Sequence, residues 1–443
     1  MRIPPGIVHL GCGAFHRAHQ AWYTQRALGI EPGPWGIVAV SLRARTVPDA
    51  LTAQDCRYHL LTRRALGAEI EPIDAIVEAL HAPSNPTLVV ARLADSATRI
   101  VTLTVTEKGY CHVPATGGLD TSHPDIAADL ADLTNPRSAV GFLVAGLSEI
   151  RKRGQVPPAI LSCDNLPENG RTLAQLVRTF AEHFDAGLAR WIEKSVSFPA
   201  TMVDRIVPAT SDDDRALVHR LSGIEDRACV VAEPFSQWVI ETWAGARPAW
   251  AQAGAQIVPA VAPYERAKIR LLNGAHSMLA YRGLLAGHKT VAEAIADPVL
   301  ARSARSLMAE ATATLTPVPG LDLASYAESL IERFANPGIQ HRLTQIAMDG
   351  SQKLPQRLLG TIADSLAAGN ECPEAFAAVT AWIEFVRLSG STLEDPLVAR
   401  LAAARDVDDL LAIDPVFGSD LPRDPRFRDR LFASLACRSA TRL

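Results

Sequence analysis

Short, nearly uninterrupted apolar runs alternate with segments of helical periodicity through the first part of the chain. We expect strands at the most apolar of these runs, at residues 7–10, 36–42, 88–90, 100–105 and 159–162. A helix begins near residue 15, and apolar side chains recur at helical spacing in residues 139–152 and 171–184. Strands that are apolar throughout and separated by helices predict a mostly parallel sheet covered on both faces.

The pattern changes after about residue 257, where strand signals become scarce. Segments rich in Ala and Leu follow at helical spacing, at residues 291–310, 324–333 and 375–388. We therefore expect an α/β fold with two domains. The first, residues 1–257, is built on a parallel sheet, and the second, residues 258–443, is mainly α-helical.

The composition is that of an ordinary globular protein. Hydrophobic residues make up 48% of the 443 residues and charged residues 21%, and the net charge is −4. No basic run stands out, so nucleic acid is not an expected partner. No stretch of 18 or more apolar residues is present, so we expect no membrane span. Residues 1–6 lead straight into a strand and lack the apolar core of a signal peptide.

The seven cysteines are scattered and never form a C-x-x-C pair. This spacing favours free thiols in a reducing cytoplasm and argues against a zinc site with cysteine ligands. The sequence does not fix the oligomeric state, and we expect a monomer or a small homo-oligomer.

A glycine motif follows the first strand. Gly11 and Gly13 form half of a dinucleotide fingerprint, in which the backbone can approach a pyrophosphate at the start of a helix. His16 occupies the third glycine position. A plain tight turn is the alternative. The motif after a first strand favours a Rossmann-like domain. The cofactor-binding residues expected around it are Gly11, Gly13, Ala14, Phe15 and Thr104.

The second strand ends in arginines. NAD-binding domains usually carry a carboxylate here for the ribose hydroxyls, but this chain has Arg43 and Arg45, and the next acid is Asp49. Either arginine could bind the 2′-phosphate of NADP, or both could simply point into water. NAD is the expected cofactor, and the sequence leaves NADP open.

The segment around Lys268 carries the strongest candidate chemistry. In a regular helix Glu265, Lys268, Asn273 and His276 fall within one arc of roughly 140°. Burying such a face requires a reason, and proton transfer is one. Burial would lower the pKa of Lys268, so that its neutral amine could take a proton from an alcohol. A solvated helix face with an ordinary ion pair is the alternative.

These residues and four further motifs resemble the long-chain polyol and aldonate dehydrogenases of the mannitol dehydrogenase family. The motifs lie at residues 9–20, 106–111, 162–170, 202–206 and 263–280. The resemblance implies an amino-terminal Rossmann-like domain, a helical carboxyl-terminal domain, an active site between them and hydride transfer without a metal.

The resemblance also implies roles for individual residues. Lys268 matches the general base, and Asn165 and Asn273 match the residues that hold the reacting oxygen. Asp204 and His276 match further active-site positions, and Glu265 matches a glutamate linked to proton exchange.

Each role has a structural alternative. Asn165 suits an Asx turn in a polar loop. Asp204 could simply pair with Arg205, and His276 could be a hydrogen-bonded core histidine.

The substrate divides this family between neutral polyols and sugar acids. A sugar acid needs a fixed cation for its carboxylate, and the chain offers Lys108, His341, Arg342 and Lys353. These stretches are more similar to fructuronate reductases (D-mannonate oxidoreductases) than to mannitol 2-dehydrogenases. Surface charge is the alternative for Lys108 and Arg342. A different class of protein, a non-catalytic module that senses NAD, is disfavoured because Lys268, Asn165, Asn273 and His276 occur together.

Overall fold

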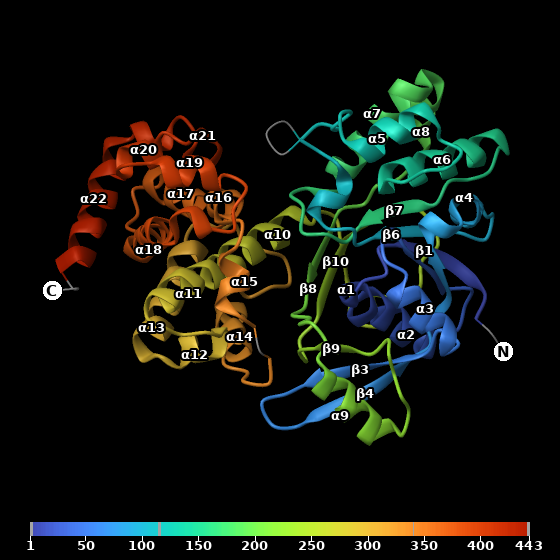
Figure 1. Ribbon diagram of the computed structural model, residues 1–443, viewed down its shortest axis with the longest axis horizontal. Coiled ribbons are helices and arrows are strands. Elements are labelled where there is room, and N and C mark those ends of the chain that lie inside the picture. Colours follow the sequence, from blue (N-terminus) through green and yellow to red (C-terminus); the bar gives the residue numbers. More distant parts are fainter. Residues whose placement is uncertain (1–2, 114–116, 340, 441–443) are drawn as a thin grey trace. The chain divides into compact units, whose positions relative to one another are not determined.

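The computed structural model describes residues 3–113, 117–339 and 341–440, with side chains described as far as residue 437. Contacts divide the chain into two compact units, Met1–Ala262 and Pro263–Leu443. Met1 and Arg2, part of the amino-terminal stretch considered above, lie outside the described residues. Figure 1 shows the helices and strands of both units, coloured along the sequence.

The first unit contains a five-stranded parallel sheet, which confirms the predicted Rossmann-like fold. Its strand order is β5-β2-β1-β6-β7. The strands are β1 (Pro5–Leu10), β2 (Gly36–Ser41), β5 (Ile76–His81), β6 (Ile100–Leu103) and β7 (Ala159–Ser162). From β1 the chain moves outward to β2 and β5, and then returns to the other side of β1 for β6 and β7.

Both faces of this sheet are buried, which explains the uninterrupted apolar runs. Alternate residues belong to two separate cores: Ile37 and Ala39 of β2 face one, and Val38 and Val40 face the other. The helices of this unit are α1 (Ala14–Ala18), α2 (Gln20–Ile30), α3 (Thr46–Ala53), α4 (Pro86–Leu93), α5 (Pro124–Ala131), α6 (Ala139–Lys152), α7 (Asn169–Phe184), α8 (Ala186–Ser195) and α9 (Asp212–Ser222). Figure 1 shows α4, α6, α7 and α8 on one face and α1 and α2 on the other.

The strand expected at residues 88–90 is wrong, because this segment belongs to α4. The side chain of Asn85 accepts a hydrogen bond from the backbone N–H of Leu88, and Pro86 occupies the first helical turn. Val89 and Leu93, one helical turn apart, are the buried residues of the helix. The β-branched pair Val89-Val90 imitates a strand, but the capping residues decide the structure.

Two small sheets complete the first unit, and neither was predicted. One has the order β4-β3-β9 and the other β11-β10-β8. Their strands are β3 (Tyr58–Arg63), β4 (Ala68–Ile73), β8 (Thr201–Asp204), β9 (Val230–Ala232), β10 (Gln237–Glu241) and β11 (Gln256–Val258). Trp238 of β10 is fully buried and packs with α2 and with Trp250.

The described residues of the second unit form helices and isolated β-bridges, and they contain no strand. This confirms the predicted helical domain. Its helices are α10 (Ala262–Lys268), α11 (Gly274–Leu285), α12 (Val291–Ala296), α13 (Pro298–Thr312), α14 (Leu323–Phe334), α15 (Leu343–Ala347), α16 (Gly350–Leu354), α17 (Gly360–Ala367), α18 (Pro373–Ser389), α19 (Val398–Ala403), α20 (Val407–Leu411), α21 (Asp414–Phe417) and α22 (Pro425–Ala440). The buried helix α11 packs against α12, α13, α15 and α18.

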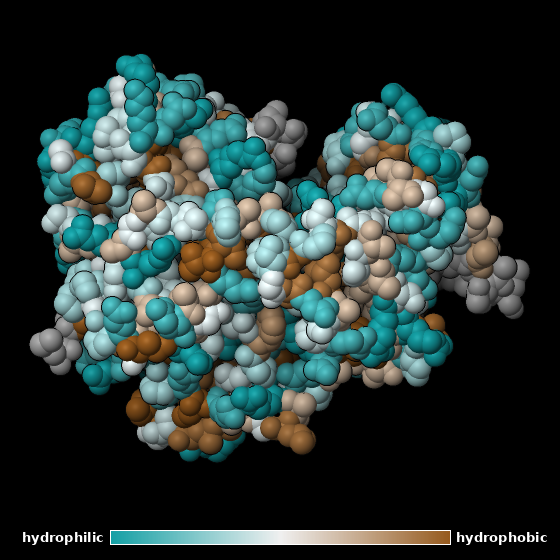
Figure 2. Space-filling model, turned by 180° about the vertical axis from the view of Figure 1, so that it is seen from behind, coloured by the Kyte–Doolittle hydropathy of each residue, from teal (hydrophilic) through white to brown (hydrophobic). Residues whose placement is uncertain are grey.

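Figure 2 shows hydrophilic residues over much of the visible face, with hydrophobic residues in separate patches. Among the described residues, no helix is both long and apolar enough to cross a membrane.

Candidate functional site

The predicted cofactor residues all follow the carboxyl ends of three parallel strands, β1, β2 and β6. Strands β2 and β5 lie on one side of β1, and β6 and β7 lie on the other, so the strand order reverses at β1. Such a switch point is where open α/β sheets bind ligands. The residues at this edge are Gly11, Gly13, Ala14 and Phe15 after β1, Arg43 and Arg45 after β2, Thr104 after β6 and Asn165 after β7. Lys108 is exposed on the short helix η2 (Glu107–Tyr110) that follows β6.

The loop after β1 requires glycine at its first position. Gly11 has a φ of +104°, and a methyl group added there would lie 2.0 Å from the carbonyl oxygen of Thr104. The Thr104 hydroxyl donates to the Gly11 carbonyl at 2.8 Å and so fixes the loop to β6. Gly13 is exposed and precedes α1. An open loop backbone at the start of a helix suits the pyrophosphate of a dinucleotide.

Two buried histidines lie beneath this loop. His9 and His16 stack with ring centroids 3.4 Å apart, and both are fully buried. His9 Nδ1 lies 2.7 Å from the Thr102 hydroxyl, and Nε2 lies 2.9 Å from the Thr104 hydroxyl. Burial lowers the pKa of His9 to about 3 and that of His16 well below its usual value. The imidazole of His16 therefore fills the third glycine position of the fingerprint as a neutral packing group.

This burial predicts acid sensitivity. Above pH 6.5 the His9 ring is neutral in both the folded and the unfolded chain, so its titration does not change the free energy of unfolding. Between pH 6.5 and about 3 only the unfolded chain binds the proton. The free energy of unfolding should fall by about 1.4 kcal/mol per pH unit, or about 2 kcal/mol from pH 6.5 to 5. Urea unfolding at both pH values should show a smaller loss for His9→Gln than for the wild-type protein. Exposed His183→Gln should match the wild type, and equal losses in all three proteins would contradict the prediction.

The arginines after β2 have partners at the surface. Arg43 forms an ion pair with Asp125 at 2.7 Å, and Arg45 lies 3.4 Å from the Ser84 hydroxyl and 3.5 Å from Asp49. Both arginines are exposed. Neither position supplies the carboxylate that usually binds the adenine ribose.

A carboxylate that sequence reasoning passed over joins the loops after β6 and β7. Asp164 accepts hydrogen bonds from the backbone N–H groups of Val105 and Thr106 at 2.9 and 3.0 Å, and from the Tyr110 hydroxyl at 2.7 Å. Tyr110 also contacts the Ser162 hydroxyl at 2.6 Å. Burial raises the pKa of Asp164, an effect that these hydrogen bonds oppose. The next residue is the exposed Asn165, so Asp164 fixes the backbone from which Asn165 projects.

Backbone strain accompanies this network. Thr106 has a φ of +64° and a ψ of +161°, a conformation strongly disfavoured for a β-branched residue. Cys111 and Glu168, in the same two loops, also have positive φ. Strain of about 1–3 kcal/mol per residue persists only where the surroundings impose it, and it is concentrated at functional sites.

Asp204 ends β8 and is 4% exposed. It pairs in register with Gln237, whose carbonyl lies 2.9 Å from His19 Nε2. The neighbouring Arg205 donates to the carbonyls of Ala18 and Glu233. The guanidinium of Arg205 is therefore bound to backbone oxygens.

The helix that carries Lys268 is interrupted by a π-helical turn. The segment η3 (Ile269–Asn273) separates α10 from α11, and the Gly274 N–H donates to the Ile269 carbonyl five residues back. The regular helix assumed from the sequence is therefore wrong. In a regular helix His276 would lie about 80° around the axis from Lys268. The π turn accommodates one extra residue, which brings His276 back to within about 20° of Lys268. Lys268 and His276 are each 6% exposed, while Glu265 and Asn273 are half-buried.

Cationic and aromatic groups surround His276. Its ring lies 4.5 Å from that of Phe334 and 5.2 Å, edge to face, from that of His341. Nε2 of His276 is buried without a hydrogen-bond partner among the described residues. Burial lowers the pKa of His276 well below its usual value, and the proximity of His341, Arg357, Arg333 and Lys268 lowers it further. A neutral imidazole in positive surroundings can donate or accept a hydrogen bond.

The remaining predicted substrate residues differ in their surroundings. Lys353 in α16 donates to the carbonyls of Ile346 and Met348, the latter at 2.5 Å. Burial lowers the pKa of His341 to about 4, and Lys353 adds to this effect. Arg342 is exposed and precedes α15.

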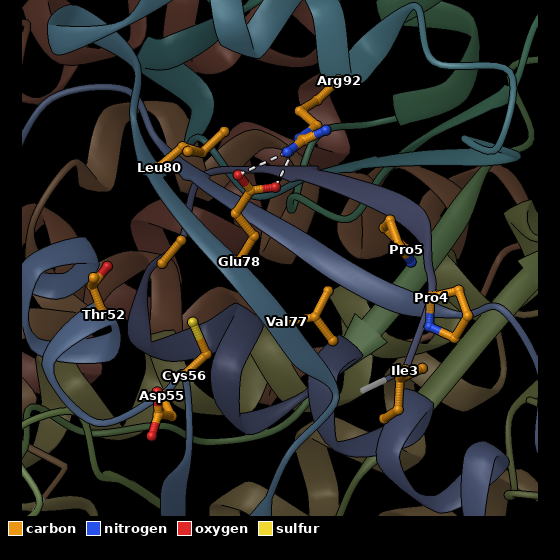
Figure 3. Close-up of a pocket in the computed structure, with 11 residues that line it drawn as sticks. Ile3, Pro4, Pro5, Thr52, Asp55, Cys56, Val77, Glu78, Leu80 and Arg92 are labelled. Carbon is orange, nitrogen blue, oxygen red and sulfur yellow. Dashed lines mark hydrogen bonds and ion pairs between the residues drawn. The ribbon is translucent and has the colours of Figure 1, made fainter. Parts of the chain in front are cut away.

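A cavity of about 640 Å³ in the first unit lies away from these strand ends. Figure 3 shows it lined by Ile3, Pro4 and Pro5 at the start of β1, by β5, and by the ion pair of Glu78 with Arg92. The six residues of β1 span about 20 Å, so the glycine loop lies at the opposite end of the sheet. Among the described residues, no group of three or more His, Cys, Asp or Glu side chains is placed to hold a metal ion.

A glycine loop at the switch point of a parallel sheet defines the first unit as the dinucleotide-binding part of an NAD-dependent oxidoreductase. The family model of the mannitol dehydrogenase Rossmann domain matches residues 5–252, and that of the mannitol dehydrogenase C-terminal domain matches residues 260–436. The chain therefore belongs to the mannitol dehydrogenase family, the polyol and aldonate dehydrogenases that act on CH–OH groups.

Relatives of this chain act on different substrates. It is 41% identical over 444 residues to the D-mannonate oxidoreductase of Escherichia coli K12, covering 96% of this chain and 91% of that protein. It is 38% identical over 450 residues to mannitol dehydrogenase 2 of Saccharomyces cerevisiae, covering 98% and 90%. The solved complex of Pseudomonas fluorescens mannitol 2-dehydrogenase with NAD and D-mannitol superimposes with a TM-score of 0.87, at 36% identity and with 98% and 91% of the two chains covered.

Proposed function

We propose that this chain is a fructuronate reductase, which interconverts D-fructuronate and D-mannonate with NADH and NAD. One relative, at 41% identity, is a D-mannonate oxidoreductase. The observation that carries the choice of a sugar acid is the place of Arg357, which donates to the hydroxyl of Ser277 beside His276 and, with Arg333, makes the surroundings of His276 cationic. A carboxylate substrate gains from such surroundings, whereas a neutral polyol does not.

The nicotinamide supplies or accepts the hydride, and the protein positions the substrate and moves the proton. Lys268 is the proposed general base, which removes the proton of the alcohol during oxidation and returns it during reduction. Its neighbour on the helix face, His276, has a neutral ring that can hydrogen bond a substrate hydroxyl.

Two amides are proposed to stabilise the reacting oxygen. Asn273, half-buried at the end of the π turn, and Asn165, exposed after β7, can each donate an N–H to an oxygen that gains negative charge. A neutral amide stabilises this charge without forming an ion pair with the lysine. Asp204 and Glu265 are proposed to support proton exchange at the same site.

The second candidate is a mannitol 2-dehydrogenase, which is favoured by relatives named mannitol dehydrogenase 2 and mannitol 2-dehydrogenase. The two candidates predict opposite substrate preferences. Steady-state rates of NADH oxidation with D-fructuronate and with D-fructose should give the larger kcat/KM for D-fructuronate. A single bidentate carboxylate contact of about 1.5–3 kcal/mol corresponds to a preference of roughly 10- to 150-fold. A preference for D-fructose would overturn the proposal in favour of the mannitol enzyme.

A further inference from the structure

A second π-helical turn faces the one after Lys268. The segment η4 (Pro355–Leu359) separates α16 from α17, and the Gly360 N–H donates to the Pro355 carbonyl five residues back. The two π turns pack against each other. A methyl group added at Gly274 would lie 2.9 Å from the carbonyl oxygen of Arg357, so the two backbones meet directly at Gly274. Single π turns of this kind are frequent at functional sites.

This packing places the Arg357 side chain beside the candidate active site. Arg357 Nη1 donates to the hydroxyl of Ser277 at 3.1 Å. Ser277 is 1% exposed and follows His276 directly in α11. Arg357 itself is half-buried, so it can be reached by a small molecule and is still partly shielded from water.

The neighbouring charges favour an anion at this place. After His341, the side chains with the strongest effect on His276 are Arg357 and Arg333, and both are cationic. Two acids, Asp395 and Asp349, act together with Arg357 on the Tyr281 hydroxyl. Asp395 accepts hydrogen bonds from the Ser351 N–H, the Ser351 hydroxyl and the Leu397 N–H. That carboxylate is therefore engaged within the helical unit.

We propose that Arg357 is the residue that binds the carboxylate of the substrate, in a site formed with Ser277 and His276. A guanidinium can bind a carboxylate through two parallel hydrogen bonds, which an ammonium cannot do. Among the cations predicted from the sequence, Lys353 donates to two backbone carbonyls and Arg342 is exposed. The inference rests on the proposed function and adds the residue that selects a sugar acid over a neutral sugar.

The test compares Arg357→Gln, Arg357→Lys and the exposed control Arg302→Gln. For each enzyme, kcat and KM are measured with NADH for D-fructuronate and for D-fructose. Arg357→Gln should raise KM for D-fructuronate about 10- to 100-fold, the effect of losing a charged hydrogen-bonded contact. Its kcat/KM for D-fructose, which has no carboxylate, should fall much less than that for D-fructuronate. Arg357→Lys keeps the charge, so its KM for D-fructuronate should lie between those of the wild type and Arg357→Gln. Arg302→Gln should match the wild type.

Calorimetric binding of D-mannonate to the NADH-bound enzyme separates this inference from the proposed function. If the wild-type enzyme does not reduce D-fructuronate but D-mannonate binding still depends on Arg357, the proposed function fails and the carboxylate site stands. If Arg357→Gln leaves the D-fructuronate/D-fructose ratio of kcat/KM unchanged, or lowers both values equally, the inference is overturned. NADH affinity and thermal stability show whether Arg357→Gln is folded, and Arg357→Lys decides the question if it is not.

Discussion

Replacing Lys268 with Ala should reduce turnover by about 10²- to 10⁴-fold, the usual contribution of a general base, while NADH binding is kept. Lys268 is almost fully buried at the end of α10, next to a π turn that aligns it with His276. Removing the amine takes away the proposed acceptor of the alcohol proton. The glycine loop that is expected to bind the cofactor belongs to the other unit, so NADH affinity has no reason to change.

The matched control is Lys289→Ala, because Lys289 is an exposed lysine of the same unit. It should leave turnover and NADH affinity at wild-type values. Stopped-flow measurement of NADH oxidation, with NADH affinity from fluorescence titration, separates chemistry from binding. Wild-type turnover in Lys268→Ala would show that Lys268 is not the general base and that another group takes the proton.

The second large effect is expected for Gly11→Ala. The added methyl group would meet the Thr104 carbonyl oxygen at 2.0 Å, and the φ of +104° is itself unfavourable for alanine. Either the glycine loop or the end of β6 must move. We expect a loss of about 3 kcal/mol or more in the free energy of unfolding, in the range of overpacked sites. NADH affinity should fall by at least about tenfold, which corresponds to 1.4 kcal/mol.

Gly254→Ala isolates the effect of backbone strain. Gly254 belongs to the same unit and has a φ of +103°, but an added methyl group would meet nothing within 4 Å. This variant should lose only about 1–2 kcal/mol of stability, the cost of a left-handed residue, and should keep its NADH affinity. Urea unfolding and NADH titration of both variants measure the difference. Equal small losses and retained NADH affinity in both would show that the close approach at Gly11 is unimportant.

The central sheet could be predicted because each of its strands has its own apolar run in the sequence. Strands such as β2 are buried on both faces, so nearly every residue is apolar and the run stands out in the sequence. The short strands β9 and β11 have three residues each, too few for a recognisable pattern. At α4 the pair Val89-Val90 indicates a strand, whereas Asn85 and Pro86 indicate the start of a helix. The capping residues were the better guide.

The candidate site was predictable only in part. Lys268, Asn273 and His276 were found through a motif, but their true alignment depends on a π turn. That turn packs against the Arg357 carbonyl, 83 residues beyond Gly274 in the chain, and such a contact is invisible in one local segment. Pro355 inside a helical run was a usable signal of irregularity near Arg357. Asp164 lies within the motif at residues 162–170, but its role depends on hydrogen bonds from Val105 and Thr106 in the loop after β6.

The most direct measurement is chemical rescue of Lys268→Ala by added primary amines during single-turnover oxidation of D-mannonate with NAD. If the side-chain amine is the proton acceptor, the rate should rise with amine concentration and with the basicity of the amine. The Lys289→Ala control should show no such increase. A Lys268→Ala enzyme that ignores added amines and keeps the wild-type dependence of rate on pH would show that another group takes the proton.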